Sequence, residues 1–398
     1  MHLVVVGGGG AMGRITVRAL AEDPRVSRVT IADRDLAAGE RTRAWLAAGR
    51  EKAEVAACDA RDDAALARLL DGAGAVLNAA DYPFNLGVMR AALAAHVSYA
   101  DLGGLFHMTR QQYALDDAFR EAGITGVLGI GSTPGITNVL ARLAADQLDT
   151  LERLDVRIGS SDSRPTSAPF IAPYSIRTIL DECTLEPMVY QDGEWIAVAP
   201  MSGEEPIEFP APIGRATAMY TLHSEVALFP ISFADKGLRE ASFKIAFPPV
   251  FLEQMRLLAG LGLGGAEPIA VRGAKPGATV RVVPREVLVA LLAARGASEA
   301  PAGSDDCDVL RVVAAGTRDG TPVELVEQMV ARPFAPWQVG GGDVDTGVPL
   351  AIAGILLAQG GCPAGVRGAE LVFEPRAFLR ELAPYGMHAA ESITRTIS

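Results

Sequence analysis

With 398 residues the chain is long enough for two domains, and its 49% of hydrophobic residues are enough to build large cores. The formal net charge of −12 argues against a nucleic-acid-binding protein, which would need a basic face to neutralise phosphates. The cysteines have neither CxxC spacing nor neighbouring histidines, so we expect free thiols in a reducing compartment and no metal site.

Neither a targeting segment nor a membrane span is expected. The N-terminus lacks a basic region, and its apolar run soon ends at a glycine cluster. The longest uncharged apolar stretch, residues 348–358, is too short to cross a bilayer. A soluble, cytoplasmic enzyme is therefore the expectation.

Strands and helices alternate through the first 130 residues. Short apolar runs predict strands at residues 3–6, 26–32, 54–58, 75–79, 98–102 and 125–129. The segments between them predict helices at 12–20, 36–48, 63–70, 86–95 and about 110–122. Such alternation is typical of βαβ crossovers and a parallel sheet, so residues 1–130 are predicted to form a doubly wound Rossmann domain.

The pattern changes after residue 130 and predicts an α+β domain with an antiparallel or mixed sheet over residues 131–340. Strands are predicted at residues 154–158, 188–190, 195–198, 238–246, 309–315 and 323–330, with helices at 137–148 and 251–263. Asp192-Gly193 and Asp319-Gly320 are hairpin signals. Residues 301–308 are expected to be a polar loop. The last part, residues 341–398, is predicted to be helical at 347–359 and 375–382.

A glycine loop follows the first predicted strand and opens the first helix. Gly8, Gly10 and Gly13 satisfy G-x-G-x-x-G, and the loop also includes Ala11 and Met12. In this motif the first glycine makes a tight turn, the second lets the backbone approach the pyrophosphate, and the third lets the helix pack on the strand. Because the motif stands between a strand and a helix, dinucleotide binding is a much better prediction than an empty glycine turn.

Polar and small residues at the ends of the next strands complete the predicted cofactor site. Asp33, 20 residues after Gly13, would accept hydrogen bonds from the adenosine ribose and repel a 2′-phosphate, which favours NAD. Arg34 could stack on adenine or hold a 2′-phosphate, so NADP stays open. Asp59 is placed to meet the adenine edge or to be a solvated turn residue. Small residues after the fourth strand would let the cofactor lie close: Asn78, Ala79 and Ala80.

Several later segments resemble the saccharopine dehydrogenase superfamily, closest to its lysine 6-dehydrogenase and saccharopine reductase branch. The likeness runs over nearly the whole chain, and it depends on short motifs that occur in the same order. These motifs are DYPFN (residues 81–85), YADLGG (99–104), GSTPGITN (131–138), YTLHSEV (220–226), FKIAF (243–247) and TGVPLA (346–351).

The resemblance implies features that the patterning does not show. The Rossmann domain would be interrupted by an inserted α+β domain that binds substrate and mediates dimerisation, with C-terminal helices, residues 341–398, returning to the first domain. The chemistry would be hydride transfer at a carbon–nitrogen bond of an amino acid, as in lysine metabolism. The protein would be a homodimer or a higher oligomer.

Three residues are candidates for acid–base catalysis. Asp101 ends the fifth strand at the carboxyl edge of the sheet, where it could take a proton or instead cap the next helix. Tyr82 follows the fourth strand and could relay a proton or simply pack. His223 titrates near neutral pH and lies in a segment that resembles the family, although a hydrogen-bonded interdomain histidine is an equal alternative.

Other charged residues are candidates for substrate binding. If the segment around His223 is extended, Glu225 points to the same face and the pair could grip an amine. Arg177 and Arg215 could bind a substrate carboxylate or be ordinary surface residues. Glu182 is a weaker candidate for amine recognition.

Three functions remain open. The first is NAD-dependent oxidative deamination of a terminal amine, as in a lysine 6-dehydrogenase. The second is the reverse chemistry, NADPH-dependent reduction of an imine to a secondary amine, as in saccharopine reductase or carboxynorspermidine dehydrogenase. The third is a non-catalytic dinucleotide-binding sensor, which a fold alone does not exclude. The predicted polar cluster of Asp101, His223 and Glu225 argues against the third, because a sensor needs no converging acid–base groups.

Overall fold

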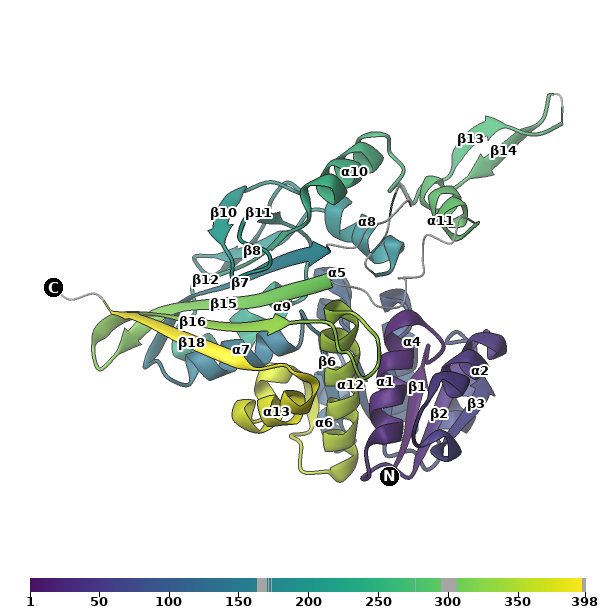
Figure 1. The fold of residues 1–398 in the computed structure, drawn as a ribbon, viewed down its shortest axis with the longest axis horizontal. Helices are drawn as coiled ribbons and strands as arrows, with labels where there is room; N and C mark the ends of the chain where they lie inside the picture. Colours follow the sequence, from purple (N-terminus) through teal and green to yellow (C-terminus); the bar gives the residue numbers. More distant parts are fainter. Residues whose placement is uncertain (163–169, 171, 173, 276, 295–305, 396–398) are drawn as a thin grey trace.

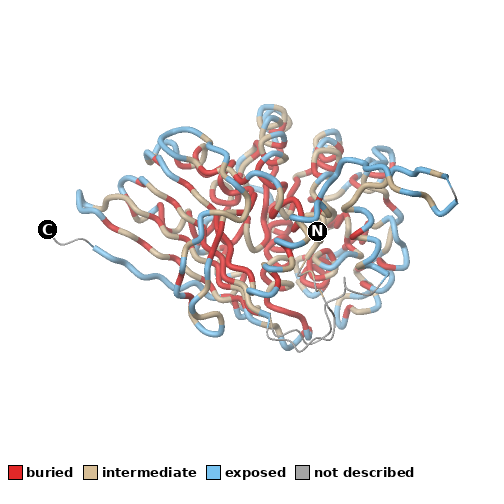
Figure 2. The backbone as a smooth tube through the Cα atoms, turned by 90° about the horizontal axis from the view of Figure 1, so that it is seen from above, coloured by how far each residue is buried: buried red, intermediate tan, exposed pale blue. Residues whose placement is uncertain are grey.

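A computed structural model describes residues 1–162, 170, 172, 174–275, 277–294 and 306–395. Its two large sheets lie side by side, one at the N-terminal end of the molecule and one running towards the C-terminus (Figure 1). The predicted fold class, a Rossmann domain with a second α+β domain, is confirmed. Buried backbone is concentrated in the centre of the molecule (Figure 2).

The Rossmann sheet has seven parallel strands in the order β17-β6-β5-β4-β1-β2-β3. Its strands are β1 (His2–Val6), β2 (Arg28–Asp33), β3 (Ala53–Ala57), β4 (Ala75–Asn78), β5 (Ser98–Asp101), β6 (Thr125–Leu128) and β17 (Gly365–Gly368). Its helices are α1 (Ala11–Glu22), α2 (Leu36–Trp45), α3 (Asp63–Leu70), α4 (Asn85–Ala94), α5 (Leu105–Tyr113) and α6 (Asp116–Glu121). The apolar runs form strands because both faces of the sheet are covered: in β1, Leu3, Val4 and Val5 are fully buried.

The second sheet is mixed and has nine strands, in the order β10-β11-β12-β7-β15-β16-β18, with β8 and β9 attached at β12. Only β12 and β7 run parallel among the pairs formed by the described residues. The strands are β7 (Thr150–Asp162), β8 (Met188–Gln191), β9 (Glu194–Ala197), β10 (Glu205–Glu208), β11 (Arg215–Tyr220), β12 (Glu240–Ala246), β15 (Asp306–Arg318), β16 (Thr321–Ala331) and β18 (Ala389–Arg395). The associated helices are α7 (Ile136–Ala145), α8 (Ile176–Thr184), α9 (Glu225–Ser232), α10 (Pro249–Gly260) and α11 (Pro284–Ala294), and a hairpin, β13 (Ile269–Arg272) and β14 (Thr279–Val282), stands apart.

The C-terminal part is not purely helical, as the sequence pattern suggested. Two helices, α12 (Gly341–Gln359) and α13 (Pro375–Leu382), are joined by two strands that the pattern does not reveal. β17 adds an edge to the Rossmann sheet beside β6, whereas β18 adds an edge to the second sheet beside β16. β17 has four residues, and every residue of β18 is exposed, so neither carries a clear hydrophobic period. Asp306 also begins a strand rather than lying in the expected polar loop; residues 301–305 of that loop lie outside the described residues.

Helix α12 is longer than the apolar run that suggested it. With 19 residues it has the length and composition to cross a membrane, but 72% of its apolar window is buried inside the protein. It packs on α1, where the Thr16 hydroxyl donates a hydrogen bond to the Gly347 carbonyl over 2.8 Å. α12 is thus the helix by which the C-terminal part covers the Rossmann sheet (Figure 1).

Close packing of α12 on α1 predicts a stability defect for Gly347→Ala. A Cβ at position 347 would lie 2.5 Å from the Ile15 Cβ, so the two helices would have to separate. We expect the free energy of unfolding to fall by about 1–3 kcal/mol, the usual cost of overpacking a core, in urea titrations followed by circular dichroism. The matched control is Gly260→Ala, at the end of α10 with open space around it, which should be neutral or slightly stabilising. Equal losses in the two variants would contradict the packing argument.

Candidate active site at the carboxyl edge of the Rossmann sheet

The glycine loop between β1 and α1 has the shape of a dinucleotide cradle. The left-handed residue of the turn is Gly7, with φ of +75°, rather than Gly8 as the motif suggested. A Cβ on Gly13 would lie 2.1 Å from the Gly7 carbonyl oxygen, so only glycine lets α1 start this close to the strand. Gly10 caps α1 without a side-chain hydrogen bond, and the first turn, which includes Ala11 and Met12, holds no acid. The free N–H groups of this turn therefore fit a pyrophosphate.

Asp33 shapes this loop from the end of β2. Its carboxylate accepts hydrogen bonds from the Gly9 N–H at 3.0 Å and from the Asp35 N–H at 2.9 Å. Arg34, next in sequence, is exposed. Asp59 forms an ion pair with Arg61 at 2.5 Å, so its carboxylate is shared with a cation rather than free in a turn. The predicted contacts of these residues with the adenosine part stay predictions.

The residues after β4 support the loop from below. A Cβ on Gly7 would lie 2.7 Å from the Ala80 nitrogen, so Ala79 and Ala80 lie directly against the glycine turn. The Asn78 side chain is fully buried and donates to the Asn85 side chain over 2.8 Å. Asn78 thus fixes the loop that carries Ala79 and Ala80 in place.

Asp101 is a structural carboxylate in this arrangement, which corrects the expectation that it meets the substrate. It is fully buried, and one oxygen accepts from the backbone N–H groups of Gly103 at 2.9 Å and Gly129 at 2.8 Å. The other oxygen accepts from the Tyr99 hydroxyl and the Gln112 amide. Burial raises the pKa of Asp101 above its ordinary value. With four donors around it, Asp101 joins the loops after β5 and β6, and it does not cap α5, whose N-cap is Gly104.

Tyr82 connects the two domains. It lies in a short 3-10 helix after β4, and its hydroxyl donates to the Asp181 carboxylate on α8 over 2.6 Å. Asp181 is itself buried and forms an ion pair with Arg285 at 2.5 Å. Burial and the Asp181 carboxylate raise the pKa of Tyr82 well above its ordinary value, so the phenol keeps its proton at neutral pH.

His223 and Glu225 form the predicted pair, although the segment is not extended. His223 lies in a loop, Glu225 is the first residue of α9, and the His223 Nδ1 is hydrogen-bonded to a Glu225 carboxylate oxygen. The imidazole stacks on Phe243, with ring centroids 3.8 Å apart and an interplanar angle of 8°. Both side chains are buried, which fixes the ring orientation.

Two threonines of the loop and helix after β6 hold the other oxygen of Glu225. The Thr133 hydroxyl donates to it, and the Thr137 hydroxyl donates to it over 3.1 Å. Neither threonine was singled out beforehand, although both belong to the GSTPGITN motif and follow a predicted strand at the carboxyl edge. The hydroxyls and the imidazole outweigh the effect of burial and lower the pKa of Glu225, so the carboxylate is charged.

Glu182 adds a second acid beside the histidine. It is buried on α8, where the Tyr174 hydroxyl donates to it. Burial raises the pKa of Glu182 to about 7, even though His223 opposes the shift. For His223 the balance is reversed: burial would lower its pKa, but Glu225 and Glu182 together raise it. The site therefore holds its protons near neutral pH.

The two candidate arginines do not join this cluster. Arg177 forms an ion pair with Glu286 on α11, at 2.6 Å, and is 41% exposed. Arg215 starts β11 and is exposed. Neither position suits a carboxylate bound beside His223, so their predicted role is not supported.

The cluster lies where three parallel strands end. The loop after β4 provides Tyr82, the loop after β6 provides Thr133, and a Cβ on Gly103, after β5, would lie 3.4 Å from the Ser224 hydroxyl. In open α/β sheets, ligands bind in the crevice outside the carboxyl ends of the strands. The glycine loop after β1 lies at the same edge, so dinucleotide and acid–base groups share one side of the sheet.

Comparison with known proteins agrees with this geometry. Residues 3–127 match the family model of the saccharopine dehydrogenase NADP binding domain. The fold matches apo saccharopine dehydrogenase (L-Glu forming) from Saccharomyces cerevisiae with a TM-score of 0.72 and 17% identity, covering 99% of each chain. The chain belongs to the saccharopine dehydrogenase superfamily. It is an NAD(P)-dependent dehydrogenase acting on a carbon–nitrogen bond.

Two curated relatives are named for amine products. The chain is 26% identical to carboxyaminopropylagmatine dehydrogenase of Synechocystis sp. over 97% of its own length and 96% of the relative's. It is 25% identical to carboxynorspermidine synthase of Vibrio cholerae over 73% of its own length and 72% of the relative's. This saccharopine dehydrogenase-like chain thus resembles relatives named for carboxylated amines along most of its length.

The ion pair predicts that Glu225→Gln lowers the pKa of His223. Removing the charge of Glu225 leaves burial, which favours the neutral imidazole, opposed by Glu182 alone. NMR titration of the histidine ring signals, assigned with His223→Asn, measures the shift. The control is Glu327→Gln, another buried acid on β16. An unchanged His223 titration in Glu225→Gln would contradict the coupling.

Proposed function

We propose that this enzyme reduces an imine, formed between an aldehyde and a primary amine, to a secondary amine. The names of both curated relatives support this direction better than the oxidative deamination of lysine that the sequence favoured. The structural observation that carries the proposal is the buried His223–Glu225 pair beside Glu182 at the carboxyl edge of the sheet. The reaction needs a proton donor there, and a histidine with a raised pKa is one.

The pair suits an acid more than a base. An imine accepts hydride readily when its nitrogen is protonated, and the His223 imidazolium supplies that proton. The nicotinamide, when bound, supplies the hydride to the imine carbon, whose carbon–nitrogen π electrons become the nitrogen lone pair. Glu225 stabilises the imidazolium before transfer and fixes the Nδ1 side of the ring. Oxidation of an amine would instead need a base ready to accept a proton, which a raised pKa disfavours.

The acidic surroundings suit a cationic amine substrate. Glu182 and Asp181 are adjacent on α8, both are buried, and Glu225 lies close enough to raise the pKa of Glu182. A substrate with an ammonium or guanidinium group would receive charge-assisted hydrogen bonds from such carboxylates. We therefore propose a polyamine or guanidino amine as the amine partner and an amino acid with a terminal aldehyde as the other.

We also propose NADPH as the cofactor. The family model that matches is that of an NADP binding domain. The Asp33 oxygens accept the N–H groups of Gly9 and Asp35, so this residue has a structural task in the loop. Arg34 is exposed at the end of β2, where the 2′ position of the adenosine ribose lies in Rossmann domains. A guanidinium there binds a 2′-phosphate with charge-assisted hydrogen bonds.

Arg34→Ala should weaken NADPH binding and leave NADH binding nearly unchanged. We expect the Kd of NADPH to rise by about tenfold, since hydrogen bonds to charged groups contribute on the order of 1.5–3 kcal/mol. Fluorescence titration of both cofactors measures the effect. The control is Arg41→Ala, an exposed arginine on α2. Equal weakening of NADPH and NADH by Arg34→Ala would contradict the assignment.

The activity itself is tested by oxidation of NADPH at 340 nm. Oxidation should require both an amine, such as agmatine or 1,3-diaminopropane, and an amino-acid aldehyde. Mass spectrometry should show a product equal to the two substrates minus water plus two hydrogens. The opposing experiment supplies lysine with NAD⁺ or NADP⁺. Dinucleotide reduction with lysine, and no coupled product from the amine and aldehyde, would favour oxidative deamination instead.

His223→Asn should lower kcat by roughly 10²–10⁴-fold, the usual contribution of general acid–base catalysis. NADPH affinity should stay unchanged. In the wild type, kcat should fall as pH rises through the raised pKa of His223, because the donor loses its proton. His107→Asn is the control, since His107 lies on α5 outside the cluster. A wild-type kcat in His223→Asn would exclude the acid role.

A further inference from the structure

A hairpin arm, β13 and β14, projects from the second domain without joining either large sheet (Figure 1). Its four-residue strands pair with each other, from Ile269 opposite Val282 to Arg272 opposite Thr279. Seen from above, it is an exposed extension at one end of the molecule (Figure 2). Ile269 is 51% exposed and Val280 46%. An isolated two-stranded hairpin is marginally stable in water, so a surface that covers these side chains would stabilise it.

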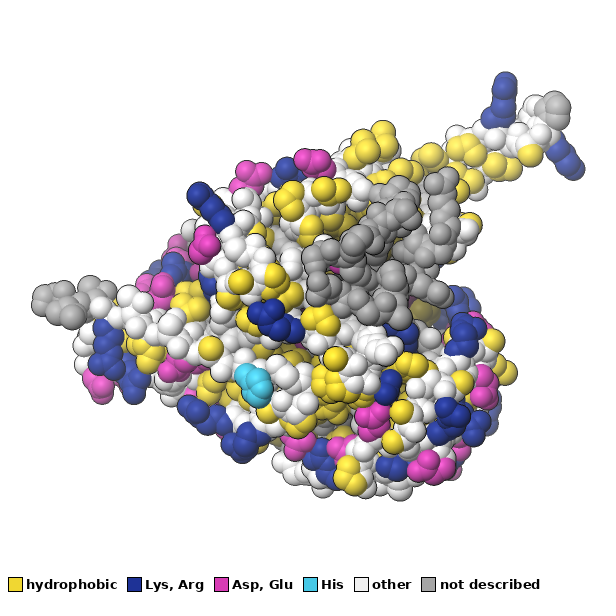
Figure 3. All heavy atoms as spheres, viewed as in Figure 1, with side chains coloured by type: hydrophobic (Ala, Val, Ile, Leu, Met, Phe, Trp, Pro, Cys, Tyr) yellow, Lys and Arg dark blue, Asp and Glu magenta, His cyan; other side chains and the backbone are white. Residues whose placement is uncertain are grey.

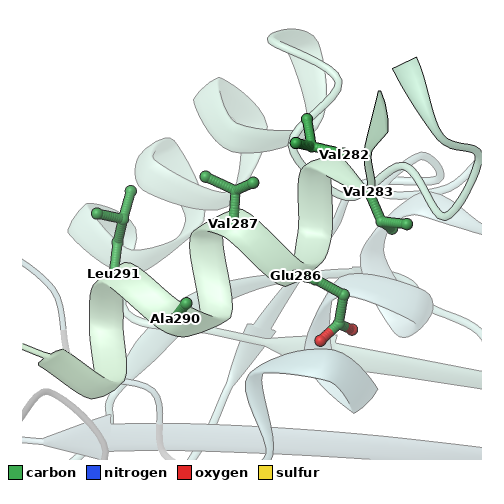
Figure 4. A pocket seen from close by; sticks show the side chains of 6 residues that line it. All are labelled: Val282, Val283, Glu286, Val287, Ala290 and Leu291. Atoms are coloured by element: carbon green, nitrogen blue, oxygen red, sulfur yellow. The ribbon is translucent and has the colours of Figure 1, made fainter. Parts of the chain in front are cut away.

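An open apolar groove runs along α11 at the base of the arm (Figure 4). Its volume is about 450 Å³, and Val282, Val287 and Leu291 project along the same side of the helix, while Glu286 points away. Val287 and Leu291 are four residues apart and well exposed, as expected for one face of a helix that lacks a partner. The knob of the hairpin and the groove beside it therefore belong to one continuous apolar surface.

The arm also has a charge opposite to that of the chain. Between Ile269 and Val282 the sequence contains Arg272, Lys275 and Arg281 and no acidic residue, whereas the chain as a whole has a net charge of −12. Hydrophobic side chains line the arm and cationic ones occupy its outer end (Figure 3). This charge distribution favours an acidic partner surface, and a second copy of this chain is one.

We propose that the arm docks on a second copy of this chain, with the hairpin of each copy in the α11 groove of the other. A two-fold interface requires one patch to be self-complementary, and a protrusion next to a groove meets that requirement. Each copy then buries Ile269 and Val280 against Val287 and Leu291 of its partner, twice in one dimer.

The base of the arm is tied to the proposed active site. Arg285 and Glu286, in the first turn of α11, pair with Asp181 and Arg177 of α8, the helix that carries Glu182. Docking of α11 would therefore also hold α8 in place. The inference itself concerns assembly and does not depend on the reaction proposed above, since its test measures mass.

The test compares the mass of the full chain and of Ile269→Asp/Val280→Asp by light scattering after size exclusion. We expect the wild type to have at least twice the 41.7 kDa of one chain and the variant to have half the mass of the wild type. Leu36→Asp, an exposed leucine on α2, is the control and should keep the wild-type mass. A monomeric wild type at 100 µM, or a double variant with the wild-type mass, would overturn the proposal.

Two further variants protect the test against misfolding. Arg272→Glu/Lys275→Glu/Arg281→Glu changes only exposed charges and should dissociate the assembly at lower protein concentration than the wild type. Separate Val280→Cys and Leu291→Cys chains, mixed under oxidising conditions, should form an intermolecular disulfide that neither forms with the wild type. Wild-type dissociation in the charge variant together with no crosslink in the mixture would place the interface elsewhere.

Discussion

The carboxylate of Glu225 holds together the two halves of the proposed site. It is fully buried, so its charge must be compensated within the protein. One oxygen receives the hydroxyls of Thr133 and Thr137, from the loop and helix after β6 of the Rossmann sheet. The other receives the imidazole of His223, from the loop that precedes α9. The same charge that needs these donors also keeps the histidine protonated, so position and protonation have one cause.

The Rossmann half of the molecule was predictable because its signals are local. Fully apolar strands, amphipathic helices and the glycine loop each fit within a dozen residues, and all reappear at nearly the expected positions. The exact turn residue was not predictable: Gly7 takes the left-handed conformation because the strand ends one residue earlier than the motif implies. The arm and the strands β17 and β18 lack a hydrophobic period, so only tertiary pairing defines them.

The candidate site was predictable only in part. His223 and Glu225 are two residues apart and were paired correctly, although through a loop and a helix start rather than through a strand. Asp101 was misplaced, because strand topology gives the edge at which a side chain lies but not whether it faces the crevice or the interior. Asp181 and Tyr174 could not be found at all, since their partners, Tyr82 and Glu182, are known only from packing.

The distribution of buried acids explains why the two carboxylate clusters serve different ends. Around Asp101, four donors from one domain surround the charge, and Gln112 and Tyr99 complete a closed network. Around Glu225 and Glu182, the donors come from separate elements, and one of them is a titratable histidine. A closed network fixes loops. A network that contains a titratable group can give up a proton and recover it, which is what reduction of a protonated imine requires of the protein.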